Sequence, residues 1–226
     1  MTRYLFPLLL IVQFFLAALV PAQMLPQSQV AVVGRFAAGP VNVPVTVSSK
    51  DSVTPFDSGN AAVWPAEAQL RWFFRNGGKT AEVIRIDPHR PLAQALRGSF
   101  APPGLSGLGV VTVLSDLGVL VAPELSEINS GDRDAALASL SPLAAARHFV
   151  LVMDPSSKST SITAITTWAA GLPQDLSFAL LSFPRLLVES RDLPGGAGTD
   201  LLPIGGSGAI AAIIARNDAA GGLWTT

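Results

Sequence analysis

Short apolar runs of strand length alternate along the chain with longer segments of helical periodicity. Runs that are apolar without strict alternation are typical of strands buried on both faces. A looser alternation over 43–48 indicates one further strand. The sequence therefore predicts these strands: 29–35, 81–86, 110–114, 119–122, 149–153 and 178–183.

The clearest helix begins at Trp64-Pro65, because proline is tolerated in the first helical turn. Ala66, Leu70, Phe73 and Phe74 then fall at i, i+4, i+7 and i+8, which forms one apolar face. The sequence 76–78 (Asn-Gly-Gly) ends this helix, since these residues accept left-handed backbone angles. Four more helices are expected: 91–97, 134–146, 162–170 and 208–218.

The segments between these elements are rich in Gly, Pro and polar residues, and they predict loops at 51–60, 101–109 and 192–206. Strands that alternate with helices predict a three-layer α/β domain with a mainly parallel central sheet. A chain of 226 residues is long enough for one sizeable domain of this kind.

Residues 1–22 form a separate segment, in which 5–20 are almost wholly apolar after a positively charged start. A helix of this length is shorter than the ~30 Å hydrocarbon core of a bilayer. The small-residue pattern that ends at Ala22 is typical of a secretory signal cut at that point. An uncleaved membrane anchor is the alternative.

The composition narrows the possible chemistry. With 15 Lys and Arg against 16 Asp and Glu, the net charge of -1 gives no electrostatic reason to bind nucleic acid, and it leaves little repulsion between copies of the chain. The absence of cysteine excludes disulfides, thiolate metal sites and cysteine nucleophiles. Only two histidines, His89 and His148, are available for acid–base chemistry near neutral pH.

Two motifs resemble catalytic or binding motifs without completing them. The sequence 77–80 (GGKT) contains the end of a phosphate-binding loop, but Phe73 stands where that loop needs a glycine, and a helix precedes it. Ser207 lies in a G-x-S-x-A setting, where a nucleophilic serine would need a base and a carboxylate. Asp116 and His148 have the right chain order but not the flanking residues, so Ser207 is expected to be a helix N-cap.

The remaining candidates favour structural roles. The acidic residues Glu124, Glu127, Asp132 and Asp134 are too sparse for a calcium loop, and they predict a solvated loop beside a helix N-terminus. No residue is therefore assigned a catalytic, cofactor-binding or metal-ligating role. The tryptophans are expected in cores or at subunit contacts, and two arginines are candidate interface residues: Trp64, Trp72, Trp168, Trp224, Arg85 and Arg216.

Several segments, taken in order, resemble the contractile tail sheath family of phages and phage-derived injection machines. The most specific are 73–78 (FFRNGG) followed by 83–86 (VIRI). The others are 32–35 with 39–45, 117–125, 152–155, and 202–224.

The resemblance implies a subtilisin-like α/β core domain over 23–226 that has no protease activity. In this family the subunits form stacked six-fold rings around an inner tube. The implied partners are copies of the chain, a tube protein and baseplate components, with no cofactor, small-molecule substrate or nucleic acid. The implied location is a virion tail, or the host cytoplasm before assembly.

The sequence departs from the family pattern at both ends. It stops after Trp224, where family members continue into a further part that carries an extended C-terminal arm, so the core domain is expected to be truncated there. At the other end, residues 1–7 look like a sheath start, but an apolar stretch follows, as a local reading-frame error would produce. If residues 1–22 are a working signal, the protein is exported or anchored, and an exported subtilase-like hydrolase or its inactive relative is the alternative.

Overall fold

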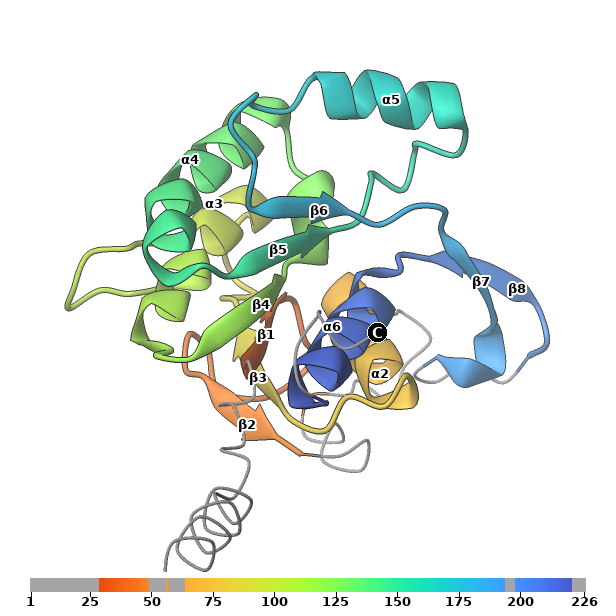
Figure 1. Ribbon diagram of the computed structural model, residues 1–226, viewed down its shortest axis with the longest axis horizontal. Coiled ribbons are helices and arrows are strands. Elements are labelled where there is room, and N and C mark those ends of the chain that lie inside the picture. The colour runs from red at the N-terminus through yellow and green to blue at the C-terminus, as the bar shows by residue number, and fades with distance from the viewer. Residues whose placement is uncertain (1–28, 49–55, 57–63, 194–197, 221–226) are drawn as a thin grey trace, which may run out of the picture.

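A six-stranded sheet forms the centre of the chain in a computed structural model that describes residues 29–48, 56, 64–193 and 198–220 (Figure 1). All neighbouring strands run parallel except β2, which is antiparallel to β3 at one end of the sheet. The strand order is β2 (Val45–Val47), β3 (Ala81–Arg85), β1 (Gln29–Gly34), β4 (Leu117–Val121), β5 (Val150–Met153) and β6 (Ala179–Leu181).

The central strands are apolar on both faces because helices cover both faces. In β1, Val30 and Val32 face one buried cluster, while Ala31 and Val33 face the other. Side chains of a strand point alternately to opposite faces, so a continuous run of Val and Ala is what this position requires.

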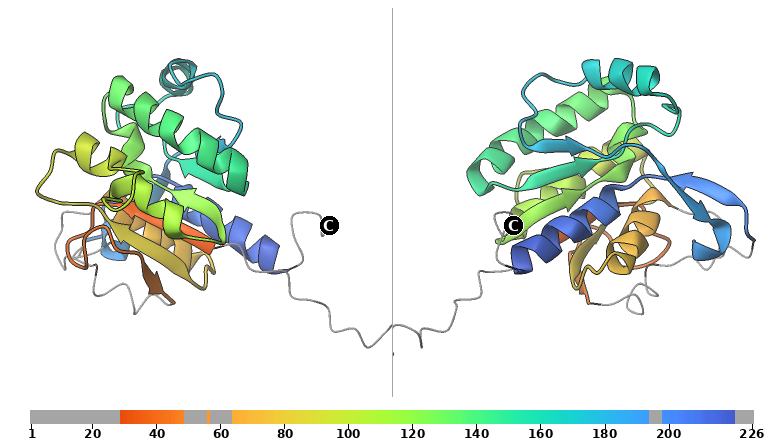
Figure 2. Two further views of the ribbon diagram at one scale, coloured as in Figure 1. Left: turned by 90° about the vertical axis from the view of Figure 1, so that its left-hand side faces the viewer. Right: turned by 45° about the vertical axis from the view of Figure 1, so that its right-hand side comes forward.

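Helices α2 (Pro65–Arg75) and α6 (Ser207–Ala219) pack side by side on one face (Figure 2). Leu70, Phe73 and Ala211 contribute to the buried cluster beneath them. The other face carries α3 (Leu92–Arg97), α4 (Ser130–Arg147) and the 3-10 segment η2 (Gly107–Val113). The result is a three-layer α/β/α arrangement.

Two elements lie outside these layers. The hairpin of β7 (Leu186–Glu189) and β8 (Leu201–Ile204), which also carries the short turn η4 (Ser190–Asp192), packs against Ala68 and Trp72 of α2. Helix α5 (Ile162–Ala170) lies beyond β6 at the far end of the sheet (Figure 1).

The expected α/β class with a mainly parallel central sheet is confirmed. The predicted strands 29–35, 81–86 and 149–153 correspond to β1, β3 and β5, and the predicted helix 162–170 is α5 to the residue. The predicted strands 43–48 and 178–183 are shorter than expected, and the predicted helix 134–146 begins earlier, at Ser130.

Two predictions are wrong. Residues 110–114 are not a strand but belong largely to η2, because Gly107 adopts a positive φ of 54° and the segment coils into the core beside α3. Residues 192–206 are not all loop, because β8 pairs antiparallel with β7, a strand that the sequence analysis did not predict. Pro203 fits there because its hairpin has no further strand beside it.

The apolar segment 1–22 and Trp224 lie outside the described residues, as does nearly all of the predicted loop 51–60. Among the residues that the structure describes, no helix combines the length and apolar character needed to span a membrane.

Candidate functional site

The carboxyl edge of the parallel sheet is the expected location of a binding or catalytic site, because ligands of open α/β sheets bind there. The short 3-10 turn η3 (Pro123–Ser126) follows β4 at this edge, and Asp154 follows β5. Helices α2 and α6 begin at the same edge. A cavity of about 300 Å³ opens between these elements and the β7–β8 hairpin, and its lining includes Gln69, Glu127, Asp154, Arg185 and Leu202.

Asp154 and Ser207 form the most enclosed polar pair at this edge. Asp154 Oδ1 accepts from the Ser207 amide nitrogen at 2.9 Å, and Oδ2 accepts from Ser207 Oγ at 2.6 Å. Gly205 is required beside them, since a Cβ there would lie 2.1 Å from the Asp154 carboxyl carbon. Burial raises the pKa of Asp154, while the two hydrogen bonds from Ser207 oppose that rise.

Glu124 is the second buried carboxyl group at this edge. Its Oε1 accepts from the backbone nitrogen of Arg35 at 3.0 Å. A Cβ on Gly34 would lie 2.2 Å from Oε2, so only glycine allows β1 to pass so close. Burial has the largest effect on this group and raises the pKa of Glu124 to about 7. Hydrogen bonds from the backbone, including one from Ala66 in the first turn of α2, act in the opposite direction and lower the pKa.

Gln69 joins the two helices of this face at their amino-terminal ends. Its Nε2 donates to the carbonyl of Gly205 at 3.1 Å, and its Oε1 accepts from the backbone nitrogen of Gly208 at 2.8 Å. Gly208 permits this contact, because a Cβ there would lie 2.0 Å from the Gln69 carbonyl oxygen. Asp154, Gln69 and one carboxylate oxygen of Glu124 are thus bonded to backbone at strand ends and helix starts. Glu124 Oε2 is buried and has no partner within hydrogen-bond geometry among the described residues.

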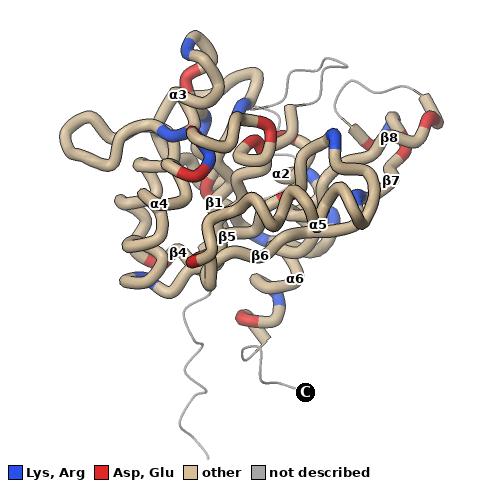
Figure 3. The backbone as a smooth tube through the Cα atoms, turned by 90° about the horizontal axis from the view of Figure 1, so that it is seen from above, with Lys and Arg blue, Asp and Glu red and all other residues tan. Residues whose placement is uncertain are grey.

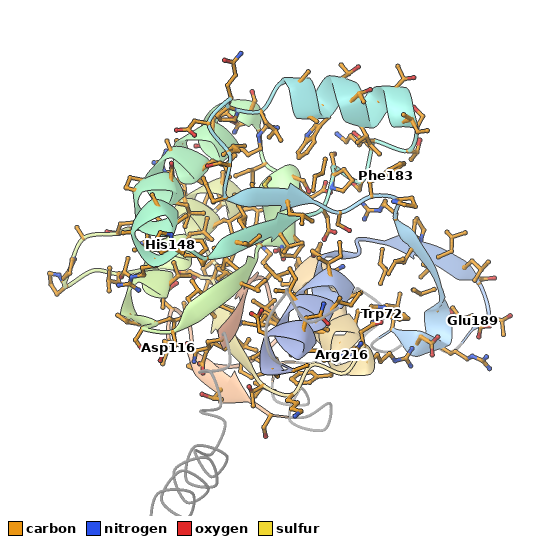
Figure 4. All side chains as sticks on the ribbon, viewed as in Figure 1. Trp72, Asp116, His148, Phe183, Glu189 and Arg216 are labelled. Atoms are coloured by element: carbon orange, nitrogen blue, oxygen red, sulfur yellow. The ribbon has the colours of Figure 1, made fainter. Side chains whose placement is uncertain are left out.

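Ser207 does not lie in a catalytic arrangement. Its side chain is fully buried, and its hydroxyl donates to a carboxylate rather than to a base. Asp116 precedes β4 and His148 precedes β5, so both lie at the amino edge of the sheet (Figure 4). Ser207 begins α6 at the opposite, carboxyl edge. His89 is exposed in the loop after β3, where its backbone nitrogen donates to Asp87.

The prediction that Ser207 is an N-cap is wrong in detail. Gly206 occupies the cap position of α6, and Ser207 is the first helical residue. The amide of Ser207, one of the four unpaired amides at the start of α6, is bonded to Asp154, which follows the distant strand β5. Asp154 directly follows β5 in the sequence, but no local pattern indicates that it bonds to the start of α6, 53 residues later.

The GGKT segment is a helix terminus. The Gly77 nitrogen donates to the Phe74 carbonyl at 3.1 Å, and the Gly78 nitrogen donates to the Phe73 carbonyl at 3.0 Å. Gly77 has a φ of 89°, so the pair forms a Schellman motif that ends α2. These nitrogens are therefore bonded to helix carbonyls, where a phosphate loop would present them to a ligand.

The acidic residues 124–134 do not converge. Glu127 accepts from the backbone nitrogen and hydroxyl of Ser157 at 2.8 and 2.9 Å. Asp132 lies in the first turn of α4, whose N-cap Asn129 accepts from its backbone nitrogen at 2.9 Å. Within the described part of the chain, no group of three His, Cys, Asp or Glu residues is arranged to hold a metal ion.

The described tryptophans each lie beside an arginine. The guanidinium carbons of Arg35, Arg75 and Arg133 lie 5.2 to 5.4 Å from the ring centres of Trp64, Trp72 and Trp168. The Arg35–Trp64 pair holds the start of α2, and the Arg133–Trp168 pair holds α5 against α4, whereas Arg75 and Trp72 both lie in α2.

The two candidate interface arginines make contacts within the chain. Arg85 donates to the carbonyls of Phe36 at 2.9 Å and Gly39 at 3.0 Å. Arg216 donates to the Asn76 carbonyl at 3.2 Å, next to the end of α2. Arg85 therefore stabilises the loop before β2 from within the chain.

The class that the fold defines is a three-layer α/β domain whose polar edge residues are engaged in capping. Neither a family model nor a curated protein matches the sequence. The structure is similar to a chain of the contracted sheath complex of PVC, an extracellular contractile injection system, with 15% sequence identity and a TM-score of 0.56. The similarity covers 87% of this chain and 46% of that chain, so this chain spans less than half the length of the sheath chain that it matches.

Proposed function

We propose that this chain is a structural subunit of a contractile sheath, in a phage tail or a related injection system, and that it is not an enzyme. The observation that carries the proposal is the likeness of nearly the whole described fold to a solved sheath subunit. The sheath-like segments of the sequence support it, because they occur along the chain in the order of the sheath family.

In this proposal residues 23–226 form the subtilisin-like core domain of the sheath. The partners are other copies of the chain, a tube protein inside the sheath and baseplate components at its end. The protein works in an assembled tail, after residing in the cytoplasm of the producing cell.

The carboxyl edge of the sheet supports a structural role over the exported-hydrolase alternative. A hydrolase needs an accessible nucleophile beside a base. Ser207 is buried and bonded to Asp154, and the only candidate triad partners lie at the other edge of the sheet.

Self-association of the full chain tests the proposal. We expect sedimentation velocity to show concentration-dependent particles larger than a monomer, and electron microscopy to show rings or tubular stacks. Sulfate should strengthen the association, because it is excluded from protein surfaces. A homogeneous monomer at every concentration would contradict the proposal.

A second experiment separates the two functions. A fluorophosphonate probe labels accessible, activated serines, and we expect it to label the native chain no more than a Ser207→Ala variant. Labelling of the native chain that disappears in Ser207→Ala would establish the hydrolase instead.

A further inference from the structure

Within the described residues, the central sheet ends at β2 on one side and at β6 on the other. Strand β2 is hydrogen-bonded only to β3, and β6 only to β5, among the strands that the structure describes. Such edges carry unpaired backbone groups and are sites of contact between chains unless they are protected. The two ends lie on opposite sides of the molecule (Figure 1).

Exposed apolar side chains gather at both ends. At the β2 end, Val41 and Val43 are 36% and 50% exposed. At the α5–β6 end, Ile162, Leu180 and Phe183 are 71%, 40% and 42% exposed. Single exposed apolar residues are ordinary, but groups of them mark interaction sites.

The described segments that form the two ends carry little charge, although Lys158 and Arg185 flank the segment at the α5–β6 end. No charged residue occurs in 36–48, and Asp175 is the only one in 159–184. The helix α5 and strand β6 carry no Lys, Arg, Asp or Glu (Figure 3). Depletion of charge is the compositional sign of an interface core. The two ends match each other because the described segments of both are poor in charges that a partner would have to desolvate.

The charged side chains next to the β2 end are turned inward. The Glu82 carboxylate accepts from Thr46 Oγ1 at 2.6 Å and from Gln29 Nε2 at 3.0 Å, and Glu82 is buried. The Arg85 guanidinium is bonded to loop carbonyls of 36–39. A partner that covers this end therefore meets apolar and neutral groups.

We propose that the α5–β6 end of one copy docks against the β2 end of a second copy, an inference that rests on the proposed sheath function. Because the ends are different and lie on opposite sides, the contact is head-to-tail. A contact of this kind builds rings or open filaments, whereas a self-complementary patch stops at a dimer.

Two single-lysine variants test the contact in the full chain. Val43→Lys blocks only the β2 end, and Leu180→Lys blocks only the α5–β6 end, because a lysine buried without a partner is costly. We expect each variant to need about tenfold or more protein for half-association, as measured by sedimentation velocity. Val113→Lys is the matched control, since Val113 is 57% exposed but belongs to η2, outside both ends.

An equimolar mixture of the two variants gives the decisive result. Each variant keeps one intact end, so the mixture should form a one-to-one heterodimer that cannot grow, because its free ends both carry lysine. Thermal unfolding of all variants should match the native chain, since the changed positions are exposed.

The outcomes separate the two proposals. A native chain that never associates overturns both the sheath function and this contact. A native chain that associates, with both end variants behaving like Val113→Lys, overturns the contact alone. Weakened single variants whose mixture forms no heterodimer also overturn it, because the interface would then not be head-to-tail.

Discussion

Asp154 Oδ2 lies 2.6 Å from Ser207 Oγ, and Asp154 Oδ1 lies 2.9 Å from the Ser207 backbone nitrogen, although the residues are 53 positions apart. The pair joins the carboxyl end of β5 to the first turn of α6. A carboxylate at a helix N-terminus is favourable for the helix dipole as well as for the unpaired amide. Asp154 is therefore the residue that fixes α6 on the sheet.

Replacing Asp154 with alanine should destabilise the fold strongly. The change leaves the amide and hydroxyl of Ser207 without acceptors in a buried site, so we expect the free energy of unfolding to fall by about 2–4 kcal/mol. Chemical denaturation monitored by circular dichroism measures this loss. Ser207→Ala should cost less, about 1 kcal/mol, because the backbone bond remains.

Asp200→Ala is the matched control for this comparison, since Asp200 is an exposed aspartate on the loop that leads into β8. We expect a change within about 0.5 kcal/mol. Equal losses for Asp154→Ala and Asp200→Ala would show that the capping contact is not important for stability.

Glu124 should make the stability of the fold depend on pH. Burial disfavours the carboxylate and raises the pKa of Glu124 from its ordinary value of 4.5 to about 7 in the folded chain. The folded state therefore holds this proton more tightly than the unfolded state. The stability that this proton contributes is fully present below pH 4.5 and is lost as the pH rises through 7. The loss is about 3 kcal/mol, because each unit of pKa difference corresponds to about 1.4 kcal/mol.

Glu124→Gln removes this dependence, because the amide keeps the shape of the neutral acid. We expect the variant to be more stable than the native chain at pH 8 and to differ little near pH 4.5, as measured by urea denaturation at each pH. Glu127→Gln, three residues away and exposed, should leave the native pH dependence unchanged. A native stability curve that rises between pH 5 and 8 relative to Glu124→Gln would refute the assignment.

Gly77→Ala should weaken the end of α2. The native φ of 89° is unfavourable for any residue with a Cβ, and the added carbon would lie 3.0 Å from Arg216 Cδ. We expect a loss of about 1–2 kcal/mol in the free energy of unfolding. Gly104→Ala provides the control, because the space around Gly104 is open.

Lys79, two residues after Gly77, tests whether the GGKT segment binds phosphate groups. We expect calorimetry to detect no binding of ATP to the native chain. Lys79→Ala should likewise bind no ATP, and its free energy of unfolding should equal that of the native chain. Binding of ATP that is lost in Lys79→Ala would contradict the helix-terminus assignment.

Local sequence patterns predicted the structure correctly where a single local preference determines the element. The run Val30 to Val33 is buried on both faces, and Asn76 to Gly78 ends a helix by its own backbone preferences. These features supplied β1, α2 and the alternation of strands and helices from which the three-layer class follows.

Local sequence patterns did not predict the structure where contacts with residues far away in the chain determine the backbone conformation. Residues 110–114 are as apolar as a strand, yet a Cβ at Gly109 would lie 1.8 Å from the Ser99 carbonyl oxygen, so a neighbouring loop sets the coil of η2. The β7–β8 hairpin is packed on Trp72, far away in the chain. The bond between Asp154 and Ser207 likewise depends on the sheet topology, which no local pattern encodes.

Arg133 should control the mobility of α5. Its guanidinium lies 5.2 Å from the Trp168 ring centre and donates to the Gly171 carbonyl at 3.0 Å, while Ile165 is the only buried residue of the helix. Because so little else holds α5, Arg133→Ala should raise the equilibrium constant for local opening of α5 by about tenfold or more, a loss of about 1.4 kcal/mol or more. Hydrogen exchange of 162–170 measures this change.

Arg97→Ala tests whether the effect is specific, since Arg97 is half-exposed and pairs with Asp132 at 3.5 Å at the start of α4. We expect this variant to leave exchange in α5 unchanged. If Arg133→Ala raises exchange equally in α4, β5 and α5, the residue supports the whole domain and does not act as the tether of α5. If only 162–170 respond, α5 is an independently opening element at the end of the sheet where we propose that a second copy docks, and Arg133→Ala should then also weaken self-association.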